Sequence, residues 1–360
     1  MKAYLILQNG KVFEGTAIGA EGESIGEVVF TTAMVGYMET ITDPSYYGQI
    51  VAQTFPLIGN YGAMKVDSES AKPALSGYIV RELCQEGSNF RKEEELNEFL
   101  VRNNVVGISG VDTRELTRII RESGVMNGMI CKSKSKLDEK LKVLKEYKVE
   151  KAVENTSSKS VEVLNEGGKR RVVLWDFGAK ANIERELIRR DCTVIRMPYS
   201  STAEEILAQK PDGLMLSNGG GNPADNTEII AQLKKLLDKK IPTFGICLGH
   251  QLTALAMGGK TVKLKYGHRG ANQPVKDLKR GRVFITSQNH GYAVDSKSLP
   301  EDVAEIRFTN ANDFTCEGVD YKTVPAFSVQ FHPEACGGPE DTEFLFDRFI
   351  NMIEERRNNA

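Results

Sequence analysis

Residues 243–257 read TFGICLGHQLTALAM, and this stretch decides the fold of the half of the chain around it. Its first four residues predict a buried strand and its last ten a helix. Gly245 and Gly249 flank Cys247 in the pattern Gly-x-Cys-x-Gly, which lets the chain turn sharply between the two elements and exposes the cysteine side chain. The beginning of a helix also favours a thiolate over a thiol. The pattern predicts a nucleophilic cysteine, although a buried cysteine between two packing glycines explains these five residues equally well.

The residues before this stretch alternate between short apolar segments and helical patterns. Such alternation is typical of parallel strands covered by helices on both faces, with ligands bound at the carboxyl ends of the strands. We therefore predict an α/β fold class, with a doubly wound parallel sheet, for residues 171–360. The predicted strands are 172–175, 194–195, 214–216 and 243–246, and the predicted helices lie near 182–190, 203–209 and 225–239.

The N-terminal part of the chain follows a different pattern. Short β-like segments are mixed with glycine turns, and Asn9-Gly10 predicts a hairpin turn rather than part of a signal peptide. Asp112 predicts the beginning of a helix. The lysine-rich residues 131–151 favour a solvated amphipathic helix over a basic binding patch. Because residues 154–171 are polar and turn-rich, we predict a smaller α/β N-terminal domain at 1–150, a linker at 151–170 and the larger domain at 171–360.

Charge and composition exclude several classes of function. The chain has 47 Lys+Arg and 49 Asp+Glu, a formal net charge of −2, so no global field would hold nucleic acid or an anionic membrane. No apolar run approaches the roughly 18 residues of a membrane span. The six cysteines show no paired spacing, which argues against a disulfide framework. We expect a cytoplasmic protein that binds neither nucleic acid nor membrane.

Cysteine catalysis needs a base, and the chain contains four histidines. Only His332 has a carboxylate two residues away, in the segment Phe331-His332-Pro333-Glu334. Side chains at positions i and i+2 of an extended segment point to the same side, so Glu334 would orient the imidazole while it exchanges protons with Cys247. By itself this segment more often describes a surface histidine. Joined to the cysteine turn, it predicts a catalytic triad of Cys247, His332 and Glu334.

Three further patterns resemble cofactor or metal sites but fit poorly. Residues 259–261 (Gly-Lys-Thr) end like a phosphate loop, but they follow a helix rather than a strand, and a helix C-cap explains them better. Residues 219–224 fit a dinucleotide pattern, yet the acidic residue about 20 positions later lies in a lysine-rich helix. Cys247-x-x-His250 and His332-x-x-x-Cys336 are poor zinc half-sites, because a glycine turn does not cradle a closed tetrahedral metal. We expect no metal and no cofactor on this chain.

The segments around the cysteine and the histidine resemble a known family. Residues 245–251 (GICLGHQ) are similar to the nucleophile signature of the class I, or triad, glutamine amidotransferases, and residues 331–334 (FHPE) to their base signature. The N-terminal half resembles the small subunit of carbamoyl-phosphate synthetase, and the resemblance then covers essentially the full chain. The segments that carry it are 35–39 (VGYME), 42–51 (TDPSYYGQIV), 59–62 (GNYG) and 110–114 (GVDTR).

The resemblance implies a reaction and a partner. Cys247 would attack the side-chain amide of L-glutamine, ammonia would leave, and water would hydrolyse the thioester, with His332 as acid and base and Glu334 orienting it. The ammonia would pass to a large subunit that makes carbamoyl phosphate from bicarbonate and ATP for arginine or pyrimidine biosynthesis. The N-terminal domain would contact that subunit, and ATP and Mg²⁺ would bind there rather than on this chain. The family's glutamine pocket falls on Ser45, Gly219, Gly221, Leu248, Gln251, Asn289, Gly291 and Tyr292.

The chain departs from the family pattern in one loop. Gly220 and Asn222 stand where the family usually has proline and aspartate, and Gly220 predicts a more flexible loop. Tyr292 replaces a common phenylalanine, which is a mild change.

Three other functions stay open: a glutaminase for a different synthase, a non-catalytic scaffold of a synthetase, and a free-standing cysteine hydrolase. The N-terminal signature argues against the first. The intact Cys247 and His332 argue against the second. A high glutamine turnover without any partner would favour the third.

Overall fold

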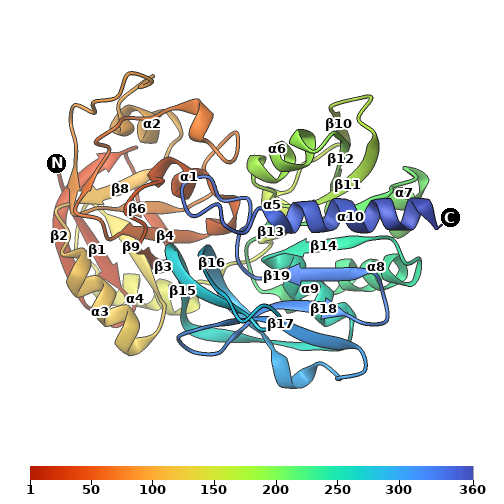
Figure 1. Ribbon diagram of the computed structural model, residues 1–360. Coiled ribbons are helices and arrows are strands. Elements are labelled where there is room, and N and C mark those ends of the chain that lie inside the picture. The colour runs from red at the N-terminus through yellow and green to blue at the C-terminus, as the bar shows by residue number, and fades with distance from the viewer. Residues whose placement is uncertain (360) are drawn as a thin grey trace. The chain divides into compact units, whose positions relative to one another are not determined.

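The computed structural model describes residues 1–359, which form two compact units (Figure 1). The first unit spans Met1–Ala152 and the second begins at Val153. Each unit has its own hydrophobic cores, and each is described separately below.

Seven strands of the first unit close into a barrel in the order β1-β2-β8-β6-β4-β3-β9. The predicted hairpin turn is confirmed: β1 and β2 pair antiparallel, and Gly10 in their turn has a φ of 87°, which favours glycine. β4 pairs in parallel with both β3 and β6, so the barrel is mixed. The strands are β1 (Lys2–Leu7), β2 (Val12–Gly19), β3 (Ser24–Thr31), β4 (Gln49–Gln53), β6 (Gly77–Ile79), β8 (Val106–Ser109) and β9 (Met126–Cys131); β5 (Leu57–Ile58) and β7 (Glu82–Leu83) form a separate pair.

The helices of the first unit follow from local signals. α3 (Thr113–Ser123) begins where the Asp112 side chain accepts a hydrogen bond from the Glu115 N–H, as the sequence predicts. Leu116 and Ile120 lie on one face of this helix and are buried in a core of the barrel. The lysine-rich segment is also helical, as predicted. The other helices are α1 (Tyr37–Thr42), α2 (Leu96–Arg102) and α4 (Leu137–Glu146).

The second unit contains a ten-stranded sheet in the order β10-β12-β11-β13-β14-β19-β18-β16-β15-β17. Strands β12, β11, β13, β14 and β19 are parallel, which confirms the predicted doubly wound core. The remaining pairings are antiparallel. The strands are β10 (Glu162–Leu164), β11 (Arg170–Phe177), β12 (Cys192–Pro198), β13 (Gly213–Gly219), β14 (Thr243–Ile246), β15 (Lys260–Asp277), β16 (Val283–Asp295), β17 (Ala304–Asn310), β18 (Cys316–Tyr321) and β19 (Ala326–Val329).

Helices cover both faces of the parallel strands. On β11, Val172 and Leu174 pack into one core with α6 and α10, whereas Val173 and Trp175 pack into another core with α7, α8 and α9. Successive strand residues point to opposite faces, so a strand buried on both sides is apolar throughout. No helix among residues 1–359 is long and apolar enough to cross a membrane. The helices are α6 (Ala181–Arg189), α7 (Ala203–Ala208), α8 (Thr227–Asp238), α9 (Leu248–Ala256) and α10 (Phe344–Asn358).

The segment 151–170 is not a free linker, so this prediction is corrected. It contains α5 (Ala152–Thr156) and the edge strand β10, which pairs antiparallel with β12. Val153 is buried in a core of the second unit, and the Ser158 N–H donates to Asp176 Oδ2 over 2.7 Å. The segment looks like a linker in the sequence because a short edge strand with one solvated face needs few apolar residues.

Candidate active site

Cys247 lies in the turn between β14 and α9, where the sequence predicts a sharp turn. Its φ of 52° and ψ of −101° place a non-glycine residue outside the ordinary backbone regions. The Cys247 N–H donates to the Val329 carbonyl on the neighbouring strand β19 over 2.8 Å, which holds the turn in place. Strain of this kind persists only where the surroundings enforce it, and it occurs mostly at functional sites. The turn lies at the carboxyl ends of the parallel strands and places the thiol at that edge of the sheet.

The two flanking glycines are needed for close packing rather than for a positive φ. A Cβ on Gly249 would lie 2.5 Å from the Leu216 carbonyl oxygen, and a Cβ on Gly245 would lie 2.7 Å from the Gly249 carbonyl oxygen. The backbone of α9 therefore approaches β13 and β14 more closely than any side chain would allow.

This packing predicts the effect of Gly249→Ala. The added methyl group meets backbone atoms that move only with the sheet, so we expect a loss of about 1–3 kcal/mol in the free energy of unfolding, as for other overpacked cores. Denaturant unfolding of the variant and the parent protein measures it. Equal stability of the two proteins would contradict the close approach of α9 to the sheet.

His332 and Glu334 lie just after β19 and form a buried pair. His332 Nδ1 is 2.6 Å from Glu334 Oε1, and both side chains are about 1% exposed. The His332 N–H donates to the Ser287 carbonyl on β16, which fixes the segment against the sheet. His332 Nε2 makes no hydrogen bond within the described part of the chain, so this nitrogen remains for Cys247 and substrate. The carboxylate holds the imidazole with Nδ1 protonated.

The charges around this pair set its protonation. Burial and the Lys180 ammonium each lower the pKa of His332, but the Glu334 carboxylate and the Cys247 thiol outweigh them and raise it to about 10. Burial raises the pKa of Glu334, but His332 and Lys180 lower it below its usual value. The structure therefore favours an imidazolium beside an ionised carboxylate.

Lys180 is a residue of this site that sequence analysis missed. Its Nζ is 3.4 Å from His332 Nδ1 and 3.8 Å from Glu334 Oε1. Its backbone N–H donates to Asn218 Oδ1 just before α6 begins, and the Asn182 side chain on that helix donates to the Glu334 carbonyl. A single lysine before a helix carries no sequence signal that distinguishes it from a solvated one.

Lys180→Met should change the pH dependence of turnover. The ammonium lowers the pKa of His332, so its removal raises that pKa, and the protonated imidazole persists to higher pH. The alkaline limb of the kcat profile, which reports loss of this proton, should move upward. The exposed Lys239→Met variant is the matched control and should keep the parent profile. A limb that stays in place or moves downward would show that Lys180 does not act on His332.

The other histidines differ from His332. His250 Nδ1 is 2.8 Å from Ser328 Oγ, and burial lowers the pKa of His250 to about 3, so it is a neutral core residue. Burial also lowers the pKa of His290 well below its usual value, together with the nearby charges of His268 and Arg269. Among the described residues, neither His250 nor His290 forms an ion pair with a carboxylate, as His332 does with Glu334.

The structure brings Gly219 and Leu248 together. A Cβ on Gly219 would lie 2.4 Å from the Phe177 carbonyl oxygen and 2.7 Å from the Leu248 side chain, so the end of β13 lies beside the first residue of α9. The first N–H groups of a helix have no intrahelical partner, which leaves the Leu248 N–H available to an oxyanion. Gly221, two residues beyond β13, has a φ of 87°.

Hydrogen bonds of Asn222 and Asn226 anchor the second half of the loop that departs from the family pattern. The Asn222 side chain accepts from the Ala224 N–H and donates to Asp225 Oδ1 over 2.8 Å. The Asn226 side chain donates to the Asn222 carbonyl. The expected flexibility at Gly220 stays a prediction.

Three predicted pocket residues meet beside Cys247. Cys247 Sγ is 3.7 Å from the Asn289 carbonyl oxygen, and Gln251 Nε2 donates to the Tyr292 carbonyl over 2.8 Å. Gln251 Nε2 also donates to Gln330 Oε1 over 2.9 Å, so its two amide hydrogens connect β16 to the segment after β19. Sequence analysis missed Gln330, which carries no motif.

Gly291 and Ser45 are the two remaining predicted residues of the pocket. Gly291 lies on β16 between Asn289 and Tyr292. Ser45 belongs to the first unit, where it is buried and its N–H donates to Asp43 Oδ1 over 2.8 Å. Its part in a pocket with residues of the second unit stays a prediction.

This fold and this arrangement of cysteine, histidine and glutamate define a class I glutamine amidotransferase domain. The family described as Glutamine amidotransferase class-I matches residues 173–352. A second family, described as Carbamoyl-phosphate synthase small chain, CPSase domain, matches residues 5–130.

Full-length relatives define the family more closely. The chain is 52% identical over 354 residues to the carbamoyl phosphate synthase small chain of Bacillus cereus, which covers 98% of this chain and 96% of the relative. It is 52% identical to that of Clostridium perfringens over 97% of this chain and 99% of the relative. The pyrimidine-specific small chain of Bacillus subtilis is 51% identical over 98% of this chain and 96% of the relative. The chain therefore belongs to the carbamoyl phosphate synthase small chain family.

Proposed function

We propose that this chain hydrolyses L-glutamine through a cysteine thioester and supplies the ammonia to a carbamoyl phosphate synthase large subunit. The observation that carries the proposal is the strained Cys247 turn next to the buried His332–Glu334 pair. A structural cysteine needs neither a positive φ nor an ion pair beside it. A thiolate nucleophile with an oriented acid and base needs both a defined position and a proton donor.

The reaction follows from the positions of these groups. Cys247 Sγ attacks the carboxamide carbon of glutamine and forms a C–S bond. The C–N bond then breaks, and the amide nitrogen leaves as ammonia with the proton from His332 Nε2. Water attacks the thioester, gives its proton to His332, and releases glutamate and the Cys247 thiolate. Glu334 keeps the ring orientation through both steps.

The oxyanion formed in each step needs hydrogen-bond donors. The Leu248 N–H at the beginning of α9 and the backbone at Gly219 are the donors that we assign, because the two residues adjoin each other next to Cys247. Gln251, Asn289, Gly291, Tyr292, Gly221 and Ser45 complete the proposed glutamine pocket. Gln251 would act indirectly: its side chain donates a hydrogen bond to the Tyr292 carbonyl and so positions the β16 segment.

The partner completes the chemistry. Free ammonia is mostly protonated at neutral pH and is then no nucleophile, so a large subunit that takes it up directly preserves its reactivity. We place ATP and Mg²⁺ on that subunit, where bicarbonate is activated for carbamoyl phosphate synthesis in the arginine or pyrimidine pathway. A cytoplasmic location suits this role, because a reducing compartment keeps the Cys247 thiol from oxidation.

An electrophilic glutamine analogue tests the site directly. We expect it to modify Cys247 before the other five cysteines, because only Cys247 lies beside the proposed pocket. Burial raises the pKa of Cys192 to about 11 and that of Cys316 to about 12, so both remain unreactive thiols at neutral pH. Peptide mapping and glutaminase assays should show labelling of Cys247 in step with loss of activity. Loss of activity in step with labelling of Cys192 or Cys316 would refute the assignment.

A further inference from the structure

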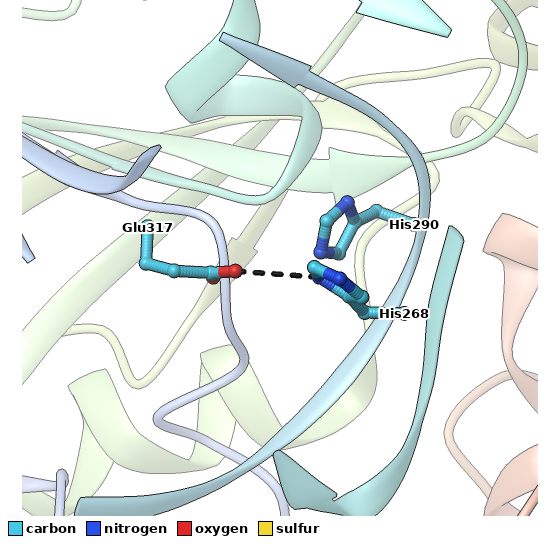
Figure 2. Close-up of side chains that lie close together, drawn as sticks. All are labelled: His268, His290 and Glu317. Carbon is cyan, nitrogen blue, oxygen red and sulfur yellow. Dashed lines mark ion pairs between the residues drawn. The ribbon is translucent and has the colours of Figure 1, made fainter. Parts of the chain in front are cut away.

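A cluster of ligand-type side chains lies on the antiparallel part of the second unit's sheet. His268 is on β15, His290 on β16 and Glu317 on β18, and one ligand atom from each lies within 4.8 Å of the others. Figure 2 shows the two rings next to each other, with the Glu317 carboxylate directed at His268. Glu317 is fully buried, and the rings of His268 and His290 meet edge to face with centroids 5.0 Å apart. The proposed glutamine chemistry uses none of these three side chains.

The hydrogen bonds around His290 leave two acceptors facing each other. His290 Nδ1 is 2.8 Å from the Tyr292 carbonyl oxygen, which only accepts, so Nδ1 carries the ring proton. The lone pair of Nε2 then faces Gln288 Oε1 at 3.0 Å. The Gln288 amide is fixed in this orientation, because its Nε2 donates to Glu317 Oε2 over 3.0 Å and to Thr286 Oγ1 over 3.2 Å. When the ring proton is on Nδ1, no hydrogen lies between His290 Nε2 and Gln288 Oε1.

His268 also has one ring nitrogen bonded to an oxygen acceptor and the other directed at the cluster. Its Nε2 lies 2.9 Å from Asp313 Oδ2 and donates to that carboxylate. Its buried Nδ1 faces Glu317 Oε1 at an ion-pair distance of 3.4 Å. Each histidine therefore donates one ring N–H to an oxygen acceptor and turns its other nitrogen toward the cluster. This is the outer-shell pattern of metal-bound histidines.

We propose that His268 Nδ1, His290 Nε2, Glu317 Oε1 and Gln288 Oε1 bind a divalent transition metal ion of the zinc type. Two imidazoles, one carboxylate and one amide oxygen suit such an ion, and Asp313 and the Tyr292 carbonyl would orient the two rings. An ion here would separate the two facing acceptors, His290 Nε2 and Gln288 Oε1. Sequence analysis expects no metal and does not identify this cluster, whose members come from three strands without a recognisable spacing.

A bound ion would connect β15, β16 and β18. His290 and Gln288 flank Asn289, whose carbonyl faces Cys247, so the ion would stiffen the strand segment that lines the proposed glutamine pocket. The role we infer is structural, because the cluster does not include the Cys247, His332 and Glu334 side chains.

Metal titration of the full chain tests this proposal. The Cys247→Ser protein is used, so that the active-site thiol does not compete, and it is first stripped with a chelator. Zn²⁺ is then titrated against a chromophoric chelator. We expect one bound equivalent, at least tenfold weaker binding in His268→Gln and Glu317→Gln, and unchanged binding in Glu305→Gln, an exposed carboxylate on β17. Far-UV circular dichroism confirms that each variant is folded.

Several outcomes would overturn the proposal. Absence of a bound equivalent would show that protons alone occupy the cluster, with His268 charged between Asp313 and Glu317. Unchanged affinity in both folded ligand variants would place the ion elsewhere. If neither variant folds, the Co²⁺ spectrum of the Cys247→Ser protein decides. Visible bands of a four-coordinate ion without sulfur charge-transfer support the cluster, whereas sulfur charge-transfer or no visible band would contradict it.

Discussion

Cys247→Ser protein, mixed with its cognate large subunit, should lose glutamine-dependent carbamoyl phosphate synthesis and keep ammonia-dependent synthesis. The hydroxyl of serine is a far weaker nucleophile than a thiolate, and loss of the nucleophile of a triad lowers turnover by roughly 10⁴–10⁶-fold. Ammonium salt bypasses the thioester, so the large subunit's reaction should persist. Two parallel assays, with glutamine and with ammonium salt as the nitrogen source, measure the separation.

The half-buried Cys84, in the first unit, supplies the matched control. Cys84→Ser should retain both activities, because this residue takes no part in the proposed site. Loss of both activities in Cys247→Ser would mean that the residue supports the assembly rather than amide hydrolysis. Retention of glutamine-dependent synthesis would remove Cys247 from the mechanism altogether.

The parallel core of the second unit was predictable because its signals are local. Strands β11, β13 and β14 are short apolar runs buried on both faces, and each is followed by a segment with helical periodicity or by the cysteine turn. The antiparallel strands β15 and β16 were not predicted. Their sequences mix lysine, glycine and polar residues: much of the first half of β15 is exposed, the middle of β16 is buried but polar, and the pairing of the two strands supplies the order.

The barrel of the first unit depends on contacts between distant residues. β1 pairs with β9, whose residues lie more than a hundred positions later, and β4 is held between β3 and β6 by parallel pairings. No periodicity in a short strand specifies its partner. The hairpin between β1 and β2 was predictable because its turn residues are adjacent in the sequence.

Some residues of the site are predictable from short local motifs, whereas others reach the site only through the fold. Cys247 and the His332–Glu334 pair lie in short motifs whose chemistry is readable from residue type and spacing. Lys180 and Gln330 reach the site only because β11 and β19 end at the same edge of the sheet, and a lysine or glutamine elsewhere in the chain looks the same in sequence. The candidate metal cluster combines residues of β15, β16 and β18 and has no sequence signature at all.

His332→Asn should lower glutamine turnover by roughly 10³–10⁶-fold, because the ammonia leaving group and the attacking water both lose their proton partner. Glu334→Gln should cost less. The glutamine carbonyl oxygen still accepts from His332 Nδ1–H, but the negative charge that raises the pKa of His332 is lost, so the imidazolium form is depleted at a lower pH. The alkaline limb of the kcat profile should therefore move downward in Glu334→Gln, opposite to its movement in Lys180→Met. His250→Asn is the control, since the neutral His250 contacts Ser328 and lies outside the proposed proton path. Near-wild-type turnover in His332→Asn, with a severe loss in His250→Asn, would reverse the assignment of the base.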